Sequence, residues 1–214
     1  VLFRSAAVLP FDFLALAAAW LLEWMMQFLE WCAALPAAVW QQHVPAPWAV
    51  ALALVGVGWT LAPRGVPWRG CGIACLAPAL MIAPALPLRG EAWITTLDVG
   101  QGLAVVVRTA SRTLLYDAGP QFSGGTDSGE RVIAPYLRAS GIGRVETLIV
   151  THNDADHSGG AASVIENFEV DEVLSSLPAA HPLLSGVPDA RACRSGVEWE
   201  WDGVRFALLH PTAG

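Results

Sequence analysis

Two histidines and two carboxylates occupy six consecutive positions near the middle of this 214-residue sequence. They lie in the stretch THNDADHSGG, residues 151–160, which directly follows the apolar run LIV at 148–150. Imidazole nitrogens and carboxylate oxygens are ligands of divalent metal ions, and alternate residues of an irregular turn can face inward. The four candidate ligands are His152, Asp154, Asp156 and His157.

A polar loop that caps a helix is the alternative interpretation of this stretch. It would account for Ser158 and Asp156, which are good helix-capping residue types, but it does not explain two histidines. Gly159 and Gly160 would let the following helix N-terminus approach an anion closely. The other histidines of this half, His181 in a loop and His210 at a strand end, are more typical of structural positions.

The surrounding periodicity predicts a layered α/β domain that presents this loop at the end of a strand. Short runs rich in β-branched residues predict strands at 93–98, 104–109, 112–117 and 146–150, and helical spacing predicts helices at 130–140 and 158–168. An Asp-Gly pair at 202–203 predicts a β-hairpin over 197–209. Residues 121–130, QFSGGTDSGE, predict a flexible loop.

Composition divides the chain at about residue 90. Residues 1–90 carry only three acidic and four basic side chains and hold seven of the ten tryptophans. Residues 91–214 carry sixteen acidic and eight basic side chains. Segregation of apolar residues and tryptophan from charge is typical of a membrane region followed by a water-exposed domain.

The apolar half predicts one long helix at 5–35 and a transmembrane helical hairpin at 47–88. At 100° per residue, Asp12, Glu23 and Glu30 lie on one stripe of the first helix. That stripe would face water at the membrane interface or other protein, or it would line a transport pathway. Arg64 and Arg69 in the hairpin connection favour the cytoplasm for that loop and the outer side for residues 91–214.

Four stretches resemble, in order and spacing, the metallo-β-lactamase-like domain of the ComEC family of competence proteins. They are TLDVGQGLAVVV, LLYDAG, ERVIAPYLRASGI and LIVTHNDADHSGG. The preceding helices resemble the last part of that family's membrane region. The resemblance implies an αββα sandwich, here incomplete, because the family's later GD and HHGS motifs have no match before residue 214. We therefore expect a piece of a longer protein, inactive by itself.

The resemblance also implies a two-ion site for Mn²⁺ or Zn²⁺. His152 and Asp154 would serve one ion, and Asp156 and His157 the other, with Asp156 essential for catalysis. Asp154 stands where the wider superfamily has histidine, and this extra oxygen ligand favours Mn²⁺. Asp117, in LLYDAG, would orient the ligands without binding metal. Asp98 is expected to fix the glycine-rich turn that follows it.

The function that the resemblance implies is hydrolysis of phosphodiesters in incoming DNA by part of an inner-membrane DNA-uptake channel. The expected partners are DNA, the lipid bilayer and other components of the uptake machinery, with the domain on the periplasmic or extracellular side. Two alternatives stay open. One is a membrane-anchored hydrolase of a small ester or thioester, because one fold hosts many chemistries. The other is a non-catalytic structural domain of the channel.

Overall fold

The computed structural model describes residues 12–35, 38–178 and 180–211. The chain forms two compact units, residues 1–41 and residues 42–214. The second unit holds both the apolar hairpin and the α/β domain. The boundary at residue 90, which was drawn from composition, stays a prediction.

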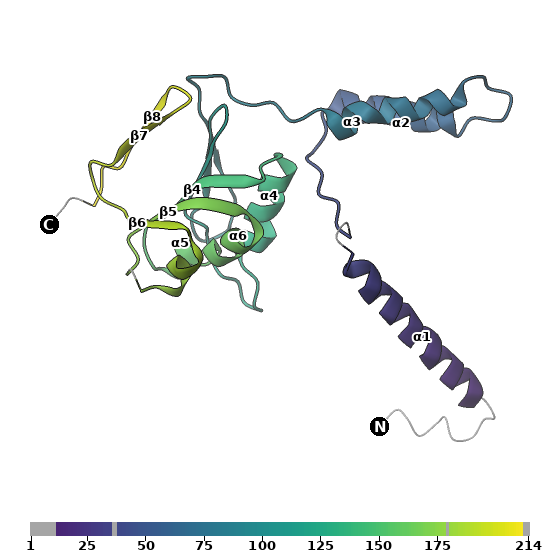
Figure 1. Ribbon diagram of the computed structural model, residues 1–214, viewed down its shortest axis with the longest axis horizontal. Helices are drawn as coiled ribbons and strands as arrows, with labels where there is room; N and C mark the ends of the chain where they lie inside the picture. The colour runs from purple at the N-terminus through teal and green to yellow at the C-terminus, as the bar shows by residue number, and fades with distance from the viewer. Residues whose placement is uncertain (1–11, 36–37, 179, 212–214) are drawn as a thin grey trace. The chain divides into compact units, whose positions relative to one another are not determined.

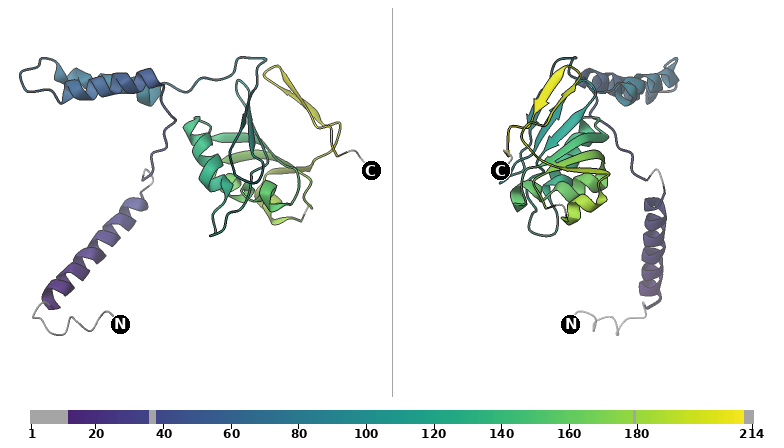
Figure 2. Two further views of the ribbon diagram at one scale, coloured as in Figure 1. Left: turned by 180° about the vertical axis from the view of Figure 1, so that it is seen from behind. Right: turned by 60° about the vertical axis from the view of Figure 1, so that its left-hand side comes forward.

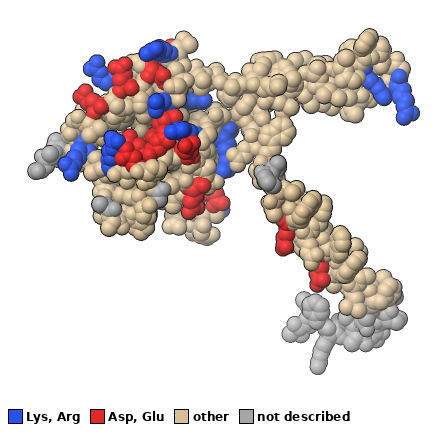
Figure 3. Space-filling view, in the orientation of Figure 1, with Lys and Arg blue, Asp and Glu red and all other residues tan. Residues whose placement is uncertain are grey.

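Helix α1, Asp12–Ala33, is the described element of the first unit (Figure 1). Its portion Phe13–Ala33, 21 residues, is long and apolar enough to cross a membrane, and none of it is buried within the protein. The acidic atoms visible on α1 in Figure 3 lie on one side of the helix. Its two described acidic side chains are Glu23 and Glu30, which are seven positions, or about two turns, apart. The predicted helix is confirmed over these residues, whereas residues 5–11 and the Asp12 side chain lie outside the described part.

The second unit begins with a helical hairpin of α2, Pro47–Thr60, followed by the 3₁₀-helix η2, Arg69–Leu76, and α3, Ala77–Met81. Its two arms pack through glycine: a Cβ atom at Gly56 would collide with the carbonyl oxygen of Gly72, and one at Gly72 with that of Gly56. Close backbone approach of this kind is common between membrane helices.

The arms of the hairpin are shorter than the sequence predicts. The second arm ends at Met81, and residues 82–88, which include two prolines, are not helical. Fourteen helical residues in α2 rise about 21 Å, against about 30 Å of bilayer hydrocarbon. In the described part of the chain, α1 alone has the length for a full span. A continuous helix over 70–88 is therefore wrong, and crossing of the membrane by the hairpin stays a prediction.

A six-stranded sheet forms the centre of the α/β domain, with strand order β1-β2-β3-β4-β5-β6 (Figure 2). β1, β2 and β3 pair antiparallel, whereas β3 through β6 run parallel. The strands are β1 Trp93–Thr96, β2 Val105–Arg108, β3 Thr113–Tyr116, β4 Arg144–Val150, β5 Glu169–Ser175 and β6 Asp189–Ala192. The first four were predicted to within two residues, but β5 and β6 were not predicted.

Short helices cover one face of this sheet (Figure 1). The predicted helix 130–140 is a π-helical turn, η3 Gly129–Ile133, that continues as α4 Ala134–Ala139. The predicted helix 158–168 is divided into α5 Ala155–Ser158 and α6 Ala161–Asn167. A further 3₁₀ turn, η4, spans Pro182–Gly186.

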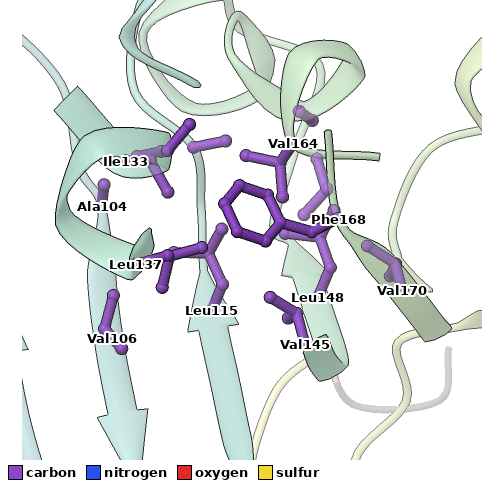
Figure 4. Packing of buried hydrophobic residues seen from close by; sticks show 14 of the residues in the cluster. Ala104, Val106, Leu115, Ile133, Leu137, Val145, Leu148, Val164, Phe168 and Val170 are labelled. Atoms are coloured by element: carbon purple, nitrogen blue, oxygen red, sulfur yellow. The ribbon is translucent and has the colours of Figure 1, made fainter. Parts of the chain in front are cut away.

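The main core lies between the sheet and these helices (Figure 4). Leu115 and Leu148 from neighbouring strands are fully buried, and Val164 and Phe168 close over them from α6 and its end. Burial of one such side chain contributes about 1.5–3 kcal/mol. This core fixes the helix layer, and with it the loop that carries the metal-type residues.

A β-hairpin packs on the opposite face of the sheet. β7, Glu198–Trp201, pairs with β8, Val204–Ala207, around the predicted Asp202-Gly203 turn. Trp199 stacks on Phe206 with ring centroids 5.2 Å apart, and both pack against Leu114 and its neighbours on the sheet. Helices, a sheet and a second small sheet therefore form consecutive layers, as the predicted sandwich requires.

Candidate metal centre

Two neighbouring parallel strands bring the site together at their carboxyl ends. β3 ends at Tyr116, which lies opposite Ile149 of β4, so the following residues Asp117 and Thr151 meet at one edge of the sheet. Asp117 has a left-handed backbone with φ of 56°, and its N–H donates to the carbonyl of Ile149 at 2.8 Å. This backbone conformation ends β3 and places Asp117 next to the ligand loop, by which we mean residues 151–160.

The Asp117 carboxylate is fully buried and is surrounded by donors from that loop. It accepts hydrogen bonds from the Thr151 N–H at 2.8 Å, from the Thr151 hydroxyl at 2.8 Å and from His157 Nδ1 at 2.7 Å. A carboxylate only accepts, so Nδ1 of His157 carries the proton. The Nε2 lone pair of His157 is then directed away from Asp117 and available to a cation.

Thr151 extends the same arrangement to His152. Its hydroxyl lies 2.8 Å from His152 Nδ1 and donates its single hydrogen to Asp117. The hydroxyl oxygen therefore accepts from Nδ1 of His152, which leaves Nε2 of that ring free as well. One buried carboxylate thus sets the tautomer of both histidines, directly for His157 and through a hydroxyl for His152.

Three of the four predicted ligands come together. His152, Asp156 and His157 each offer a ligand atom, and these atoms lie within 4.8 Å of one another. The two imidazole rings are 4.1 Å apart between centroids, and an Asp156 carboxylate oxygen lies 3.6 Å from Nε2 of His157. Two nitrogen donors and one oxygen donor fit a divalent metal ion such as Zn²⁺ or Mn²⁺.

The fourth predicted ligand, Asp154, stands beside this group. It is the most exposed of the four, and its carboxylate lies 3.4 Å from Nε2 of His152. It precedes α5, but its side chain makes no capping hydrogen bond there. Helix capping therefore does not explain Asp154, and its place next to His152 is compatible with a ligand of a second ion.

Backbone contacts hold the ligand loop against two other loops. The carbonyl of Asp156 accepts from the N–H of Leu103 at 3.2 Å, and that of His157 accepts from Ala118 at 2.8 Å. Gly102 makes the first contact possible, since a Cβ atom there would collide with the Asp156 carbonyl. Asp98 accepts from the N–H of Gly100 at 3.2 Å, so its predicted role in fixing this turn is confirmed.

Gly159 and Gly160 have a different role from the one expected. A Cβ atom at either would collide with the backbone of residues 118–121, and the Gly160 N–H donates to Gly119 at 3.3 Å. Gly159 and Gly160 therefore allow the ligand loop to pack closely against residues 118–121. Helix α6 begins only after them, at Ala161. They do not present a helix N-terminus to an anion.

The loop at 121–130 is tied to the helix layer. Gln121 and Asp127 form a β-bridge across it. The Asp127 carboxylate accepts from the Ser163 hydroxyl at 2.6 Å and from the Glu130 N–H at 2.9 Å. The sequence predicted only flexibility here and missed this anchor.

The two remaining histidines of the domain lie apart from the three gathered ligands. His181 accepts from the N–H of Leu183 at 3.3 Å and begins η4, which is a structural role. His210 lines a cavity of about 320 Å³ together with Thr151 and Cys193. Burial raises the pKa of the Cys193 thiol above its ordinary value.

The sequence reasoning missed Thr151. Its position between the end of β4 and His152 was the available signal. A hydroxyl at that position can bond to the histidine and to a group at the end of a neighbouring strand. Its role becomes clear only once β3 has brought Asp117 alongside.

Comparison with known proteins decides the family. Residues 97–212 match the model of the metallo-β-lactamase superfamily. The chain belongs to the metallo-β-lactamase superfamily.

Relatives confirm the resemblance to the ComEC family. Competence protein ComA of Neisseria gonorrhoeae is 34% identical over 210 residues, which are 96% of this chain and 28% of ComA. Recombination protein 2 of Haemophilus influenzae is 36% identical over 118 residues, 55% of this chain and 14% of that protein. The chain thus spans between a seventh and a third of these relatives.

A solved structure is similar as well. The subclass B3 metallo-β-lactamase MEM-A1, from a soil metagenome library, is 20% identical, with a TM-score of 0.38 over 55% of this chain and 49% of that one.

Proposed function

We propose that this chain is part of a membrane-bound DNA-uptake protein whose metallo-β-lactamase-like domain hydrolyses phosphodiesters. The observation that carries the proposal is the convergence of His152, Asp156 and His157, with both histidines oriented from the buried Asp117. The printed names of the relatives, a competence protein and a recombination protein, support DNA as the substrate class.

The three side chains would hold a divalent ion through Nε2 of each histidine and a carboxylate oxygen of Asp156, and Asp154 would help to hold a second ion. Such ions polarise a phosphoryl group and lower the pKa of bound water to about 7. Asp156 is half-exposed beside His157, where its carboxylate can also accept a proton from an attacking water. Thr151 and Asp117 keep both imidazoles from rotating.

The choice of metal is part of this proposal. The expected preference for Mn²⁺ rested on Asp154, which lies outside the three gathered ligands. The remaining two nitrogens and one oxygen suit Zn²⁺ equally well. DNA hydrolysis should therefore be measured with each of the two ions.

The place of action is the inner membrane, with the domain on its outer side. The apolar α1 and the hairpin support membrane attachment, and Figure 3 shows basic atoms at one end of the hairpin. Arg64 and Arg69 lie in or next to the connection between α2 and η2, which favours the cytoplasm for that connection. The domain carries eight more acidic than basic side chains, which opposes broad DNA affinity. Contact with DNA should therefore be confined to the metal cleft.

The test is hydrolysis of labelled DNA by the purified complete protein with Zn²⁺ or Mn²⁺. Asp156→Asn keeps the size of the side chain and removes its charge, so we expect cleavage to fall by at least about 10³-fold while the fold persists. His181→Ala is the matched control outside the site and should retain cleavage. The 214-residue chain alone should bind metal weakly and cleave nothing.

Other outcomes would reject the proposal in different ways. Full cleavage by a folded Asp156→Asn protein would remove this loop from catalysis. Hydrolysis of small esters without cleavage of DNA would assign the domain to the small-substrate hydrolases. Metal binding without either activity would leave a structural domain.

A further inference from the structure

A short hairpin, residues 121–127, stands beside the ligand loop. Gln121 and Asp127 form a β-bridge at its base. The N–H of Phe122 donates to the carbonyl of Thr126 at 2.8 Å, one residue further along the hairpin. These bonds hold Phe122 near the base of the hairpin, next to the ligand loop.

Glycines of the ligand loop bring this hairpin close to the metal-type residues. A Cβ atom at Gly159 would collide with the backbone nitrogen of Gln121, and Gly159 is only two positions after His157. The Cα atoms of His157 and Phe122 are therefore no more than about 16 Å apart. A strand of nucleic acid with one phosphate at the metal ions can reach Phe122 with one of its next few nucleotides.

Phe122 forms a pair with Arg131. The guanidinium of Arg131 lies 5.6 Å from the centroid of the Phe122 ring, within the range of a cation–π contact. The ring is half-buried and the arginine is exposed. Arg131 belongs to the π-helical turn η3, and a Cβ atom at its first residue, Gly129, would collide with the carbonyl of Gly160. The ligand loop therefore contacts the elements that carry both members of the pair.

The charge of Arg131 is not neutralised by an ion pair. Among the residues that the structure describes, no carboxylate lies within ion-pair distance of it. The two oxygens of Asp127 accept from the Glu130 N–H at 2.9 Å and from the Ser163 hydroxyl at 2.6 Å. Glu130 is adjacent to Arg131 in a helical turn, where successive side chains do not face each other. The guanidinium donors are therefore available to an anion.

A ring beside an exposed guanidinium is suited to an unpaired nucleotide. Bases stack on aromatic rings and on guanidinium planes, and guanidinium donors bind phosphate oxygens. A base inside a duplex is stacked between its neighbours, so it cannot use such a surface. Stacking also needs no overall positive charge, which suits a domain with eight more acidic than basic side chains.

We propose that Phe122 and Arg131 bind one unpaired nucleotide of the DNA strand whose phosphodiester lies at the metal centre. Its base stacks on the pair, and Arg131 binds its phosphate. The inference rests on the proposed function, which places the strand at the metal centre. The pair positions the strand and takes no part in the chemistry, and it makes the site prefer single-stranded over double-stranded DNA.

The experiment measures binding of labelled oligonucleotides to the complete protein by fluorescence anisotropy. All proteins carry Asp156→Asn, so that the oligonucleotide is not cleaved. The probes are a single strand with all its bases, an abasic strand of equal length and charge, and a duplex. Phe122→Leu keeps an apolar side chain and removes the ring. It should weaken binding of the first probe at least about fivefold and leave the abasic probe within about twofold.

Arg131→Gln removes the charge and should weaken binding of both single strands. The slope of log affinity against log salt concentration should become shallower by about 0.7, the contribution of one phosphate contact on a single strand. Arg205→Gln is the matched control, since Arg205 is an exposed arginine of β8, on the opposite face of the sheet. It should leave binding within about twofold, as a change outside contact distance should.

Several results would overturn the proposal. Full binding by the Phe122→Leu, Arg131→Gln double variant would do so, as would an equal loss in Arg205→Gln. An equal loss of both single strands in Phe122→Leu would indicate a disturbed loop in place of lost stacking. Tighter binding of the duplex than of the single strand would also reject the pair as a contact for an unpaired base.

Failure of the two proposals can be told apart. If DNA binding depends on the pair but the unmodified protein cleaves no DNA, hydrolysis alone is rejected. If the unmodified protein cleaves DNA and both variants bind it like their parent, the nucleotide contact alone is rejected. Both variants should keep the metal affinity of the parent, which also shows that they are folded.

Discussion

Asp117 and Asp202 form similar hydrogen-bond clusters at opposite edges of the domain. Both have left-handed backbones, with φ of 56° and 52°, and both accept hydrogen bonds from a neighbouring loop. Asp117 is fully buried and bonds to a histidine of the metal centre. Asp202 is partly exposed, and its carboxylate accepts hydrogen bonds from Thr109 and Ser111 of a turn.

The difference shows how burial gives the same local geometry two functions. Around Asp117, water cannot replace a lost hydrogen bond, so the carboxylate fixes ring orientation and proton position. Around Asp202, water can compete, so the carboxylate holds two turns together without directing any chemistry. Substitution of Asp117 should therefore change both metal affinity and stability, whereas substitution of Asp202 should change stability alone and by less.

The largest effect is expected for Asp117→Ala. His157 and Thr151 lose their shared acceptor, so metal affinity of the complete protein should fall about 10- to 100-fold. Each buried donor left unsatisfied should also cost about 1–3 kcal/mol in the free energy of unfolding. Calorimetric titration with Zn²⁺ and Mn²⁺ and denaturant unfolding measure the two effects.

Asp202→Ala is the control for that comparison and should bind metal as the unmodified protein does. Unchanged metal affinity in a folded Asp117→Ala protein would show that the buried carboxylate does not orient the ligands.

A smaller effect is expected for Thr151→Val, which keeps the shape of the side chain and removes its hydroxyl. His152 loses the acceptor for Nδ1, while His157 keeps its bond to Asp117. Metal affinity should fall about tenfold, the lower end of what loss of an outer hydrogen bond costs.

The matched control is Thr147→Val, the same change at a buried position within β4. It should leave metal affinity unchanged. An equal loss in both variants would point to a general disturbance of the strand, and the role of the Thr151 hydroxyl would be rejected.

The smallest effect concerns Asp202 and pH. Hydrogen bonds from Thr109 and Ser111 lower the pKa of Asp202 below its ordinary value of 3.8. The folded state therefore gains stability from the ionised carboxylate above about pH 4, and this gain is lost as pH falls through the lowered pKa. Asp202→Asn tolerates the left-handed backbone and removes the charge.

Thermal unfolding from pH 6 to pH 3 measures this contribution. The unfolding temperatures of the unmodified and Asp202→Asn proteins should differ at pH 6 and converge toward pH 3. A constant difference across this range would show that ionisation of Asp202 does not stabilise the fold.

The elements around the site were predictable where local pattern and tertiary packing agree. β1 to β4 and the β7–β8 hairpin have β-branched or alternating residues and clear turns, and their positions follow from the sequence. β5 is interrupted by Asp171 and Glu172, and β6, with sequence DARA, has no β-branched residue. These two strands are held by parallel pairing to their neighbours, which no local pattern records.

The residue types and spacing of THNDADHSGG determined the chemistry available to this protein, because imidazole and carboxylate groups so close together suit a metal ion. Only the tertiary structure decided which atoms converge. Asp117 is 34 positions from Thr151, and the two meet because β3 and β4 pair in parallel. That pairing buries the carboxylate, sets the histidine protons and leaves Asp154 at the rim of the group.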